Sequence, residues 1–331
     1  MRAALALAGR GLGRVWPNPA VGCILVRPDL GGRVVGRGWT QPGGRPHAET
    51  EALAQAGEMA AGATAYVTLE PCAHQGETGP CAEALVRAGV ARCIVALEDP
   101  DPRVSGKGLE ILRAAGIAVD VGCRRLDAAA LNAGFLSRVT MGRPWVGLKT
   151  ATTLDGMVAS ASGRSKWITG AEARARGHLL RARFDAILTG AGTVRADDPK
   201  LTCRLPGMED RSPMRVVMAG NTAIEPMSKV MPCRVFDNAA PQAVLTDLAK
   251  SGITRLLVEA GPRINAAFLA DDLVDEVHWF RAPKVMGGDG LAAFGELRHD
   301  DPGALPGFGI TARGMVGADT YEVWRRDRTD G

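Results

Sequence analysis

Residues 65–72 read Ala-Tyr-Val-Thr-Leu-Glu-Pro-Cys, a short apolar run that ends in a Glu-Pro-Cys turn. The run is typical of a buried strand, and the turn places a carboxylate and a thiol at its carboxyl end. Strand and helix patterns alternate around this segment, with paired strands expected at 21–26 and 34–39 and helices at 47–59 and 81–88. This alternation predicts an α/β layered sheet, a class that carries its sites at the carboxyl ends of strands.

Two further residues around this strand complete a set of metal-binding side chains. His47 begins the helix before it and Cys81 begins the helix after it, so together with Cys72 they offer one imidazole and two thiolates. One nitrogen and two sulfur ligands with an open fourth position form a known catalytic zinc set. Glu49 follows His47 by two residues and can move protons there. The pattern predicts a zinc-dependent deaminase of aminated rings.

A structural zinc site is the alternative interpretation of these ligands. It would need a fourth protein ligand, for which His74 is the nearby candidate, and it would leave Glu49 without a role. The spacing also departs from the Cys-x-x-Cys of other zinc deaminases, because residues 73–80 separate the two cysteines. We expect this polar loop to contact the substrate.

The bulk composition predicts a chain of two globular domains. Its 331 residues exceed the usual single domain, and 46% of them are apolar. The net charge of +4 is mild and dispersed, and aromatic residues make up only 5%, so nucleic acid is not an expected partner. No apolar stretch reaches the ~20 residues of a membrane span. Seven scattered cysteines favour a reducing, cytoplasmic location.

A Gly/Pro break at 141–144 predicts the boundary between a domain at 1–143 and a domain at 144–331. One helix is expected before the break, at 126–140, and a fresh strand after it, at 145–149. The second domain alternates again, with a helix at 171–183 and strands at 186–189, 214–218, 255–259 and 277–281.

Two glycine turns in the second domain follow strands, at 190–195 and 261–265, and such turns can cradle a pyrophosphate. The first turn has Arg195 where a third glycine belongs, and no helix pattern follows it, which argues against a Rossmann fingerprint. From the residues alone, ordinary turns between strands and helices are the simpler interpretation.

Short motifs in both halves give the chain a close resemblance to a known family. In the first half they are Pro17 to Gly22, His47-Ala48-Glu49, Glu70-Pro71-Cys72-Ala73-His74 and the spacing to Cys81. In the second half they are residues 148–156, 165–169, 196–202, 258–262 and 282–284. In kind and order they resemble the bifunctional riboflavin-biosynthesis deaminase/reductases. The resemblance implies a cytidine-deaminase-like α/β/α layered domain followed by a dihydrofolate-reductase-like α/β domain.

For the first domain the resemblance implies hydrolytic deamination of a diaminopyrimidinone ribosylamino phosphate. His47, Cys72 and Cys81 would bind Zn²⁺, and Glu49 would be the catalytic residue that transfers protons. Asn18 and His74 would contact the substrate. Taken alone, Pro17-Asn18-Pro19 would be interpreted as a purely structural turn.

For the second domain the resemblance implies that NADPH reduces the ribosyl group of the deaminated product to a ribityl chain. The residues matching the family's cofactor motifs are Ala151, Trp167, Thr193, Asp197, Gly261, Pro262, Arg263, Ile264, Asn265, Ala266 and Ala267. Those expected to contact the substrate are Lys149, Ser165, Arg181, Leu201, Arg204 and Glu259. We expect Lys149 to orient the sugar and the two arginines to clamp a phosphate. Ala219-Gly220 replaces the family's common Asp-Ser or Asp-Thr pair, so a cofactor contact is expected to be lost there or to be replaced by a backbone contact.

Two other classes of function remain open from the residues. One is a single-function zinc deaminase of nucleosides or RNA whose second domain is not catalytic, and the other is a zinc-stabilised scaffold without activity. The first would bind no NADPH, and loss of ammonia release in a folded Glu49→Ala variant would exclude the second. The expected partner is a small phosphorylated pyrimidine, with neither nucleic acid nor membrane, and the expected assembly is a homo-oligomer, dimer or tetramer.

Overall fold

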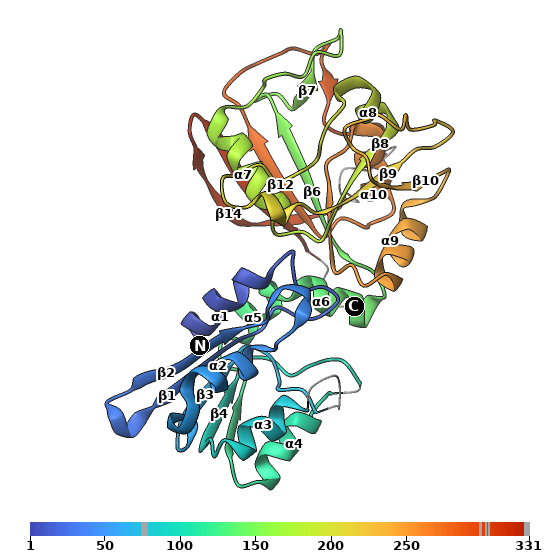
Figure 1. Cartoon of the computed structure of the whole chain (residues 1–331). Helices are drawn as coiled ribbons and strands as arrows, with labels where there is room; N and C mark the ends of the chain where they lie inside the picture. Colours follow the sequence, from blue (N-terminus) through green and yellow to red (C-terminus); the bar gives the residue numbers. More distant parts are fainter. Residues whose placement is uncertain (74–78, 103, 298–299, 302, 304, 328–331) are drawn as a thin grey trace. The chain divides into compact units, whose positions relative to one another are not determined.

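The computed structural model describes residues 1–331 except 74–78, 103, 298–299, 302, 304 and 328–331. The chain folds into two compact units, Met1–Arg143 and Pro144–Gly331, each with a main sheet of its own (Figure 1). Among the described residues, none of the helices combines the length and the apolar character that crossing a bilayer requires.

The first unit is a five-stranded sheet with the strand order β2-β1-β3-β4-β5. β1 is antiparallel to β2 and to β3, whereas β3, β4 and β5 run parallel. Its strands are β1 (Gly22–Arg27), β2 (Arg33–Trp39), β3 (Thr64–Val67), β4 (Arg92–Val95) and β5 (Ala118–Val121). Its helices are α1 (Arg2–Ala8), α2 (Ala48–Ala56), α3 (Cys81–Arg87), α4 (Lys107–Ala114), α5 (Arg125–Leu131) and α6 (Ala133–Met141). The apolar faces of these elements form one buried core, as expected for a sheet layered with helices.

The single helix expected at 126–140 is wrong, because α5 and α6 meet at Asn132 instead. The Asn132 side chain is buried and exchanges two hydrogen bonds with the backbone of Ala20. Nδ2 donates to the Ala20 carbonyl oxygen at 3.0 Å, and the Ala20 N–H donates to Oδ1 at 2.9 Å. An asparagine held in this way favours a break in the helix.

The second unit is an eight-stranded sheet with the order β10-β9-β8-β11-β6-β12-β15-β14. The strands from β10 to β12 are parallel, and β15 is antiparallel to both β12 and β14. The strands are β6 (Trp145–Thr152), β8 (Ala186–Gly190), β9 (Met214–Met218), β10 (Arg234–Phe236), β11 (Arg255–Val258), β12 (Glu276–Arg281), β14 (Phe308–Val316) and β15 (Asp319–Arg326). A separate small pair joins β7 (Met157–Ala159) to β13 (Leu291–Ala292). The helices are α7 (Ala171–Arg181), α8 (Ala191–Asp197), α9 (Pro241–Lys250) and α10 (Pro262–Ala270).

The second unit departs from the sequence expectations in several places, and β7, β10, α9 and β13 are among the elements that were not predicted. The expectation that no helix follows Gly190 is wrong, because α8 begins at the next residue. That helix has only seven residues and buries Ala191 and Val194, which is too short a pattern to detect from periodicity. The hairpin of β14 and β15 was also not predicted, since β14 is largely exposed and its pairing is interrupted between Ile310 and Ala312.

Two candidate active sites

Three metal-binding side chains of the first unit lie together beyond the carboxyl end of β3. His47 immediately precedes α2, and Cys81 is the first residue of α3. Nδ1 of His47 is 3.3 Å from Sγ of Cys81 and 3.6 Å from Sγ of Cys72. Ligands ~2.0–2.3 Å from a tetrahedral zinc ion lie about 3.5 Å from one another. The three side chains therefore fit a zinc ion that keeps one position for a further ligand.

Glycines in β2 determine how closely α2 approaches the sheet. A Cβ atom on Gly38 would lie 2.0 Å from a backbone carbonyl oxygen of α2, and one on Gly36 would lie 2.1 Å from another. Only residues without a side chain leave room for this contact. The close packing fixes the first turn of α2 against the sheet, and with it His47 and Glu49.

Glu49 lies in that first turn with 3% of its surface exposed. Burial raises the pKa of Glu49 to about 7, and the nearby Cys72 adds to the rise. The pKa of Cys72 is lowered to about 4 because Cys81 and His47 interact with its sulfur, whereas the hydrogen bond to Cys72 raises the pKa of Cys81. A carboxyl group that titrates near neutral pH is suited to accept and return a proton.

A cavity of about 310 Å³ opens onto these side chains. Its walls include Asn18, Glu49, Cys72, Asp99 and Arg138. Nδ2 of Asn18 donates a hydrogen bond of 3.0 Å to the carbonyl oxygen of Gly44, which fixes the orientation of the amide. The cavity lies within the size range of small-molecule sites. His74, the other expected substrate contact, lies outside the described residues.

Glu70 organises one wall of this cavity through its buried carboxylate. Oε1 accepts hydrogen bonds from the backbone N–H groups of Gly108 at 2.9 Å and Leu109 at 3.4 Å. Oε2 accepts from those of Gly106 at 3.0 Å and Asp99 at 3.2 Å. The segment between these donors, residues 99–109, contributes residues to the cavity wall. Glu70 therefore connects this wall to the strand that leads to Cys72.

The second unit has a cavity of about 790 Å³ bordered by both glycine-containing segments, which form the starts of α8 and α10. Seven expected cofactor residues line it: Thr193, Asp197, Gly261, Pro262, Arg263, Ile264 and Ala267. Asn265 and Ala266 are buried instead, and Nδ2 of Asn265 donates to the Ala293 carbonyl oxygen at 3.0 Å. Ala219 and Gly220, the pair that differs from the common family residues, also line this cavity.

The other expected residues near this cavity differ in exposure. Trp167 is 65% exposed, and the Arg174 guanidinium lies 4.6 Å from its ring centroid. Ser165 lines the cavity, with Oγ 3.5 Å from Oδ1 of Asp197. Leu201 is buried, so its side chain belongs to the core, and Ala151 lies in β6.

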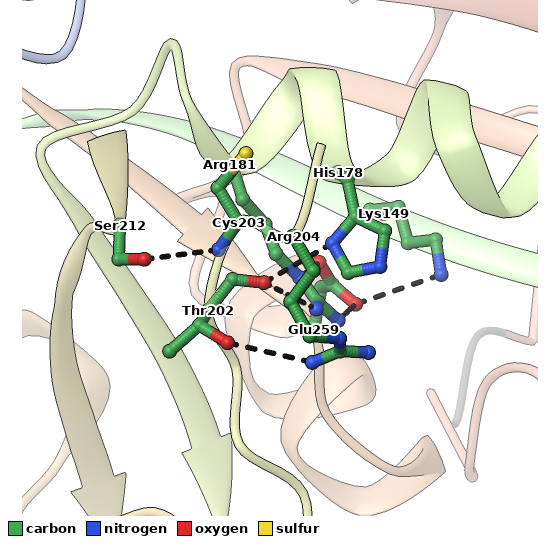
Figure 2. A network of polar contacts seen from close by, with 8 residues as sticks. All are labelled: Lys149, His178, Arg181, Thr202, Cys203, Arg204, Ser212 and Glu259. Carbon is green, nitrogen blue, oxygen red and sulfur yellow. Dashed lines mark hydrogen bonds and ion pairs between the residues drawn. The ribbon is translucent and has the colours of Figure 1, made fainter. Parts of the chain in front are cut away.

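Four expected substrate residues meet in one group of polar contacts (Figure 2). Nε and Nη2 of Arg181 each donate to a carboxylate oxygen of Glu259 at 2.9 Å. Nζ of Lys149 lies 3.5 Å from Oε2 of the same carboxylate. Nη1 of Arg181 donates to the carbonyl oxygen of Thr202 at 3.1 Å, and Nη1 of Arg204 lies 3.4 Å from Oγ1 of Thr202. With His178, these residues form what we call the polar cluster: Lys149, His178, Arg181, Thr202, Arg204 and Glu259.

The polar cluster is electropositive. Burial alone would raise the pKa of Glu259, but Arg181 and Lys149 lower it to about 2. Burial lowers the pKa of His178, and the positive charges of Arg181 and Arg204 lower it further. At neutral pH the cluster holds three cations and one carboxylate, which complements a phosphate dianion.

Sequence reasoning gave no role to Glu70 or His178. His178 precedes Arg181 by three residues in an expected helix, and that spacing places the two side chains on the same face. This signal was available in the sequence. Glu70 belongs to the Glu70-Pro71-Cys72 motif, but its hydrogen-bond donors lie 29 to 39 residues further along the chain. No local sequence pattern indicates these donors.

Two family models match the chain. Residues 1–97 match the cytidine and deoxycytidylate deaminase zinc-binding region, and residues 144–301 match the RibD C-terminal domain. Riboflavin biosynthesis protein RibD of Escherichia coli (strain K12) is 41% identical over 326 residues, covering 87% of this chain and 88% of that protein.

Two solved structures are similar over almost the whole chain. Acinetobacter baumannii RibD, form 1, has a TM-score of 0.91 and 38% identity, and the match covers 99% of this chain and 98% of that one. A Thermotoga maritima structure has a TM-score of 0.90 and 34% identity, with coverage of 98% and 97%. That protein is described as a diaminohydroxyphosphoribosylaminopyrimidine deaminase/5-amino-6-(5-phosphoribosylamino)uracil reductase.

The fold and the two sites define a zinc-binding deaminase domain followed by a reductase domain of an NADPH-using class. The α/β class expected for both halves is confirmed. The chain belongs to the RibD family of riboflavin biosynthesis proteins. It is a bifunctional riboflavin biosynthesis enzyme with deaminase and reductase domains.

Proposed function

We propose that residues 1–143 deaminate a diaminohydroxyphosphoribosylaminopyrimidine and that residues 144–331 then reduce 5-amino-6-(5-phosphoribosylamino)uracil, the two activities named for the Thermotoga maritima relative. The observation that carries the proposal is the position of Glu49. Its buried carboxyl group lines the same cavity as His47 and Cys72, and Cys81 completes their metal-binding set.

In the deaminase site His47, Cys72 and Cys81 would hold the zinc ion, which as a Lewis acid would activate a water molecule. Glu49 accepts a proton from the attacking water and passes it to the ring nitrogen. It then takes the remaining proton from the added hydroxyl group and delivers it to the amino group, so that the C–N bond breaks, a ring carbonyl forms and ammonia leaves. Asn18 hydrogen-bonds the pyrimidine ring from the wall of the cavity.

In the reductase site NADPH, when bound, would supply the hydride that reduces the sugar carbon of the opened ribosylamine. The first turns of α8 and α10, around Thr193 and Gly261, would cradle the dinucleotide in the larger cavity. The positive charge of the polar cluster suits the substrate's phosphate, which Arg204 and Arg181 bind. Lys149, which lies beside Glu259, orients the sugar.

The remaining partner and location expectations are part of the same proposal. The substrate is a small phosphorylated pyrimidine, consistent with the charge of the polar cluster. A cytoplasmic location is supported by the seven cysteines, none of which forms a disulfide. The homo-oligomeric assembly rests on the family resemblance alone.

A reciprocal pair of variants tests this division of labour. Glu49→Gln should lower ammonia release by about 10²–10⁴-fold, because general acid–base transfer contributes this much. The same protein should oxidise NADPH normally when it is given the deaminated substrate. Lys149→Ala should show the opposite pattern.

Two exposed residues provide matched controls. Glu83→Gln is the control for Glu49→Gln, and Lys250→Ala is the control for Lys149→Ala. Neither control should change either activity. Normal ammonia release by Glu49→Gln, or normal reduction by Lys149→Ala, would refute the corresponding assignment.

A further inference from the structure

His178 lies inside the polar cluster, and one of its two ring nitrogens already forms a hydrogen bond within the protein. It is half-buried in the last turn of α7, and Nδ1 lies 3.1 Å from the carbonyl oxygen of Thr202. Because a carbonyl oxygen can only accept, Nδ1 carries the proton of this hydrogen bond. Figure 2 shows Nδ1 of the imidazole turned towards Thr202, and Arg181, Arg204 and Glu259 lie near enough to act on its charge. Nε2 is then the nitrogen that can serve a ligand.

The charged groups around His178 come from four parts of the fold. Arg181 lies on the same helix, Arg204 on the loop after α8, Lys149 on β6, and Glu259 directly after β11. The Arg181 guanidinium donates both to the Glu259 carboxylate and to Thr202. Arg204 is exposed, so it is the arginine that an incoming anion meets first. His178 contacts the carbonyl oxygen of Thr202 and Arg204 contacts its hydroxyl group, so one residue holds both side chains in this part of the cluster.

We propose that His178 is a further phosphate-binding residue of the reductase site, and that its Nε2 takes up a proton from solvent when the phosphate dianion binds beside Arg204. The proposal rests on the reductase function assigned above to the second unit. In the bound state both ring nitrogens donate, Nδ1 to Thr202 and Nε2 to a phosphate oxygen. The charge-assisted hydrogen bond exists only in the protonated form of the imidazole.

The electrostatics of the cluster support this order of events. Burial and the two arginines lower the pKa of His178, so the free enzyme holds it neutral at about pH 7.5. A dianion beside the ring favours the charged imidazole and raises its pKa. Phosphate monoesters have their second pKa at about 6, so a proton taken up at about pH 7.5 belongs to the protein.

Proton uptake can be measured directly by calorimetry with ribose-5-phosphate as the probe. The binding heat of the wild-type enzyme at about pH 7.5 should depend on the ionisation enthalpy of the buffer, with an uptake of up to about one proton per site. The variant His178→Asn should bind without uptake. Its Nδ2 replaces Nδ1 as the donor to Thr202, and it offers no titratable group.

The KM of the reductase substrate provides a second readout. His178→Asn should raise the KM about tenfold at about pH 6.5, where the wild-type imidazole is charged in the complex. It should leave the KM unchanged at about pH 8.5, where that imidazole is neutral. A role confined to the structure of α7 would raise the KM equally at both pH values. The kcat of NADPH oxidation by the same preparation at about pH 8.5 reports that the second unit is folded.

The outcomes separate this inference from the function on which it rests. Equal proton uptake by wild type and His178→Asn, or a KM ratio that does not change with pH, overturns the role of His178 and leaves the reductase assignment intact. An unchanged KM in Arg204→Ala overturns the phosphate site itself, and the role of His178 fails with it.

Discussion

Glu70→Gln should destabilise the deaminase unit without altering its metal ligands. Each carboxylate oxygen of Glu70 accepts two backbone hydrogen bonds, and the residue is 4% exposed. Glutamine retains one acceptor oxygen, so two of these four N–H groups would face an amide NH₂ instead. A buried donor without a partner costs about 1–3 kcal/mol, so the unfolding free energy should fall by about 2–6 kcal/mol. For a unit of this size that corresponds to on the order of 10 °C in Tm.

The two activities of one chain allow this loss to be assigned to one unit. After brief heating at a series of temperatures, ammonia release and NADPH oxidation are assayed separately. The temperature that inactivates half of the deaminase should fall by on the order of 10 °C in Glu70→Gln, whereas that of the reductase should not change. Zinc content before heating should equal that of the wild type, and the KM for the aminated substrate should rise because the cavity wall moves.

Glu110→Gln is the matched control, since Glu110 is exposed on α4, the helix that supplies two of the donors to Glu70. It should behave as wild type in every readout. The reasoning is refuted if Glu70→Gln inactivates like Glu110→Gln, or if both activities of Glu70→Gln are lost together.

Removal of zinc by a chelator should abolish ammonia release and leave NADPH oxidation intact; ammonia release from metal-free enzyme would contradict the roles of His47, Cys72 and Cys81. Glu259 should make the second unit sensitive to acid, because its pKa falls from 4.5 when unfolded to about 2 when folded. Its ion pairs therefore contribute about 3 kcal/mol above pH 4.5, and this stability is lost as the pH falls through 2. In acid titrations followed by circular dichroism, Glu259→Gln should be less stable at neutral pH and should lose less stability between these pH values; identical titration curves would contradict the ion-pair account.

Much of the fold was predictable because its strands and helices carry local patterns. Buried strands such as β3 and β11 are short apolar runs bounded by turn residues, and these need no tertiary information. The break between α5 and α6 was not predictable, since Asn132 is held by Ala20, which lies 112 residues away. The β14–β15 hairpin was missed for a related reason. The exposed face of β14 gives a weak alternation of apolar and polar residues.

The candidate sites divide in the same way. The His47, Glu49 and Cys72 pattern is visible in sequence because zinc deaminases fix the spacing of these residues within short motifs. The polar cluster was predicted as a set of contacts but not as a network. Arg181 and Glu259 lie 78 residues apart, and their pairing shows that Arg181 positions a carboxylate in addition to any contact with a phosphate. Tertiary pairing of this kind has no signature in a single sequence.

The central claim is that one chain deaminates first and reduces second. The most direct test is a single-turnover time course in which wild-type enzyme, zinc and NADPH are mixed with the diaminohydroxyphosphoribosylaminopyrimidine. Ammonia and NADPH absorbance are then followed together. The account predicts that ammonia appears first and that NADPH oxidation follows after a lag, with one NADPH consumed for each ammonia released. NADPH oxidation that precedes ammonia, or ammonia release without any NADPH oxidation, would contradict it.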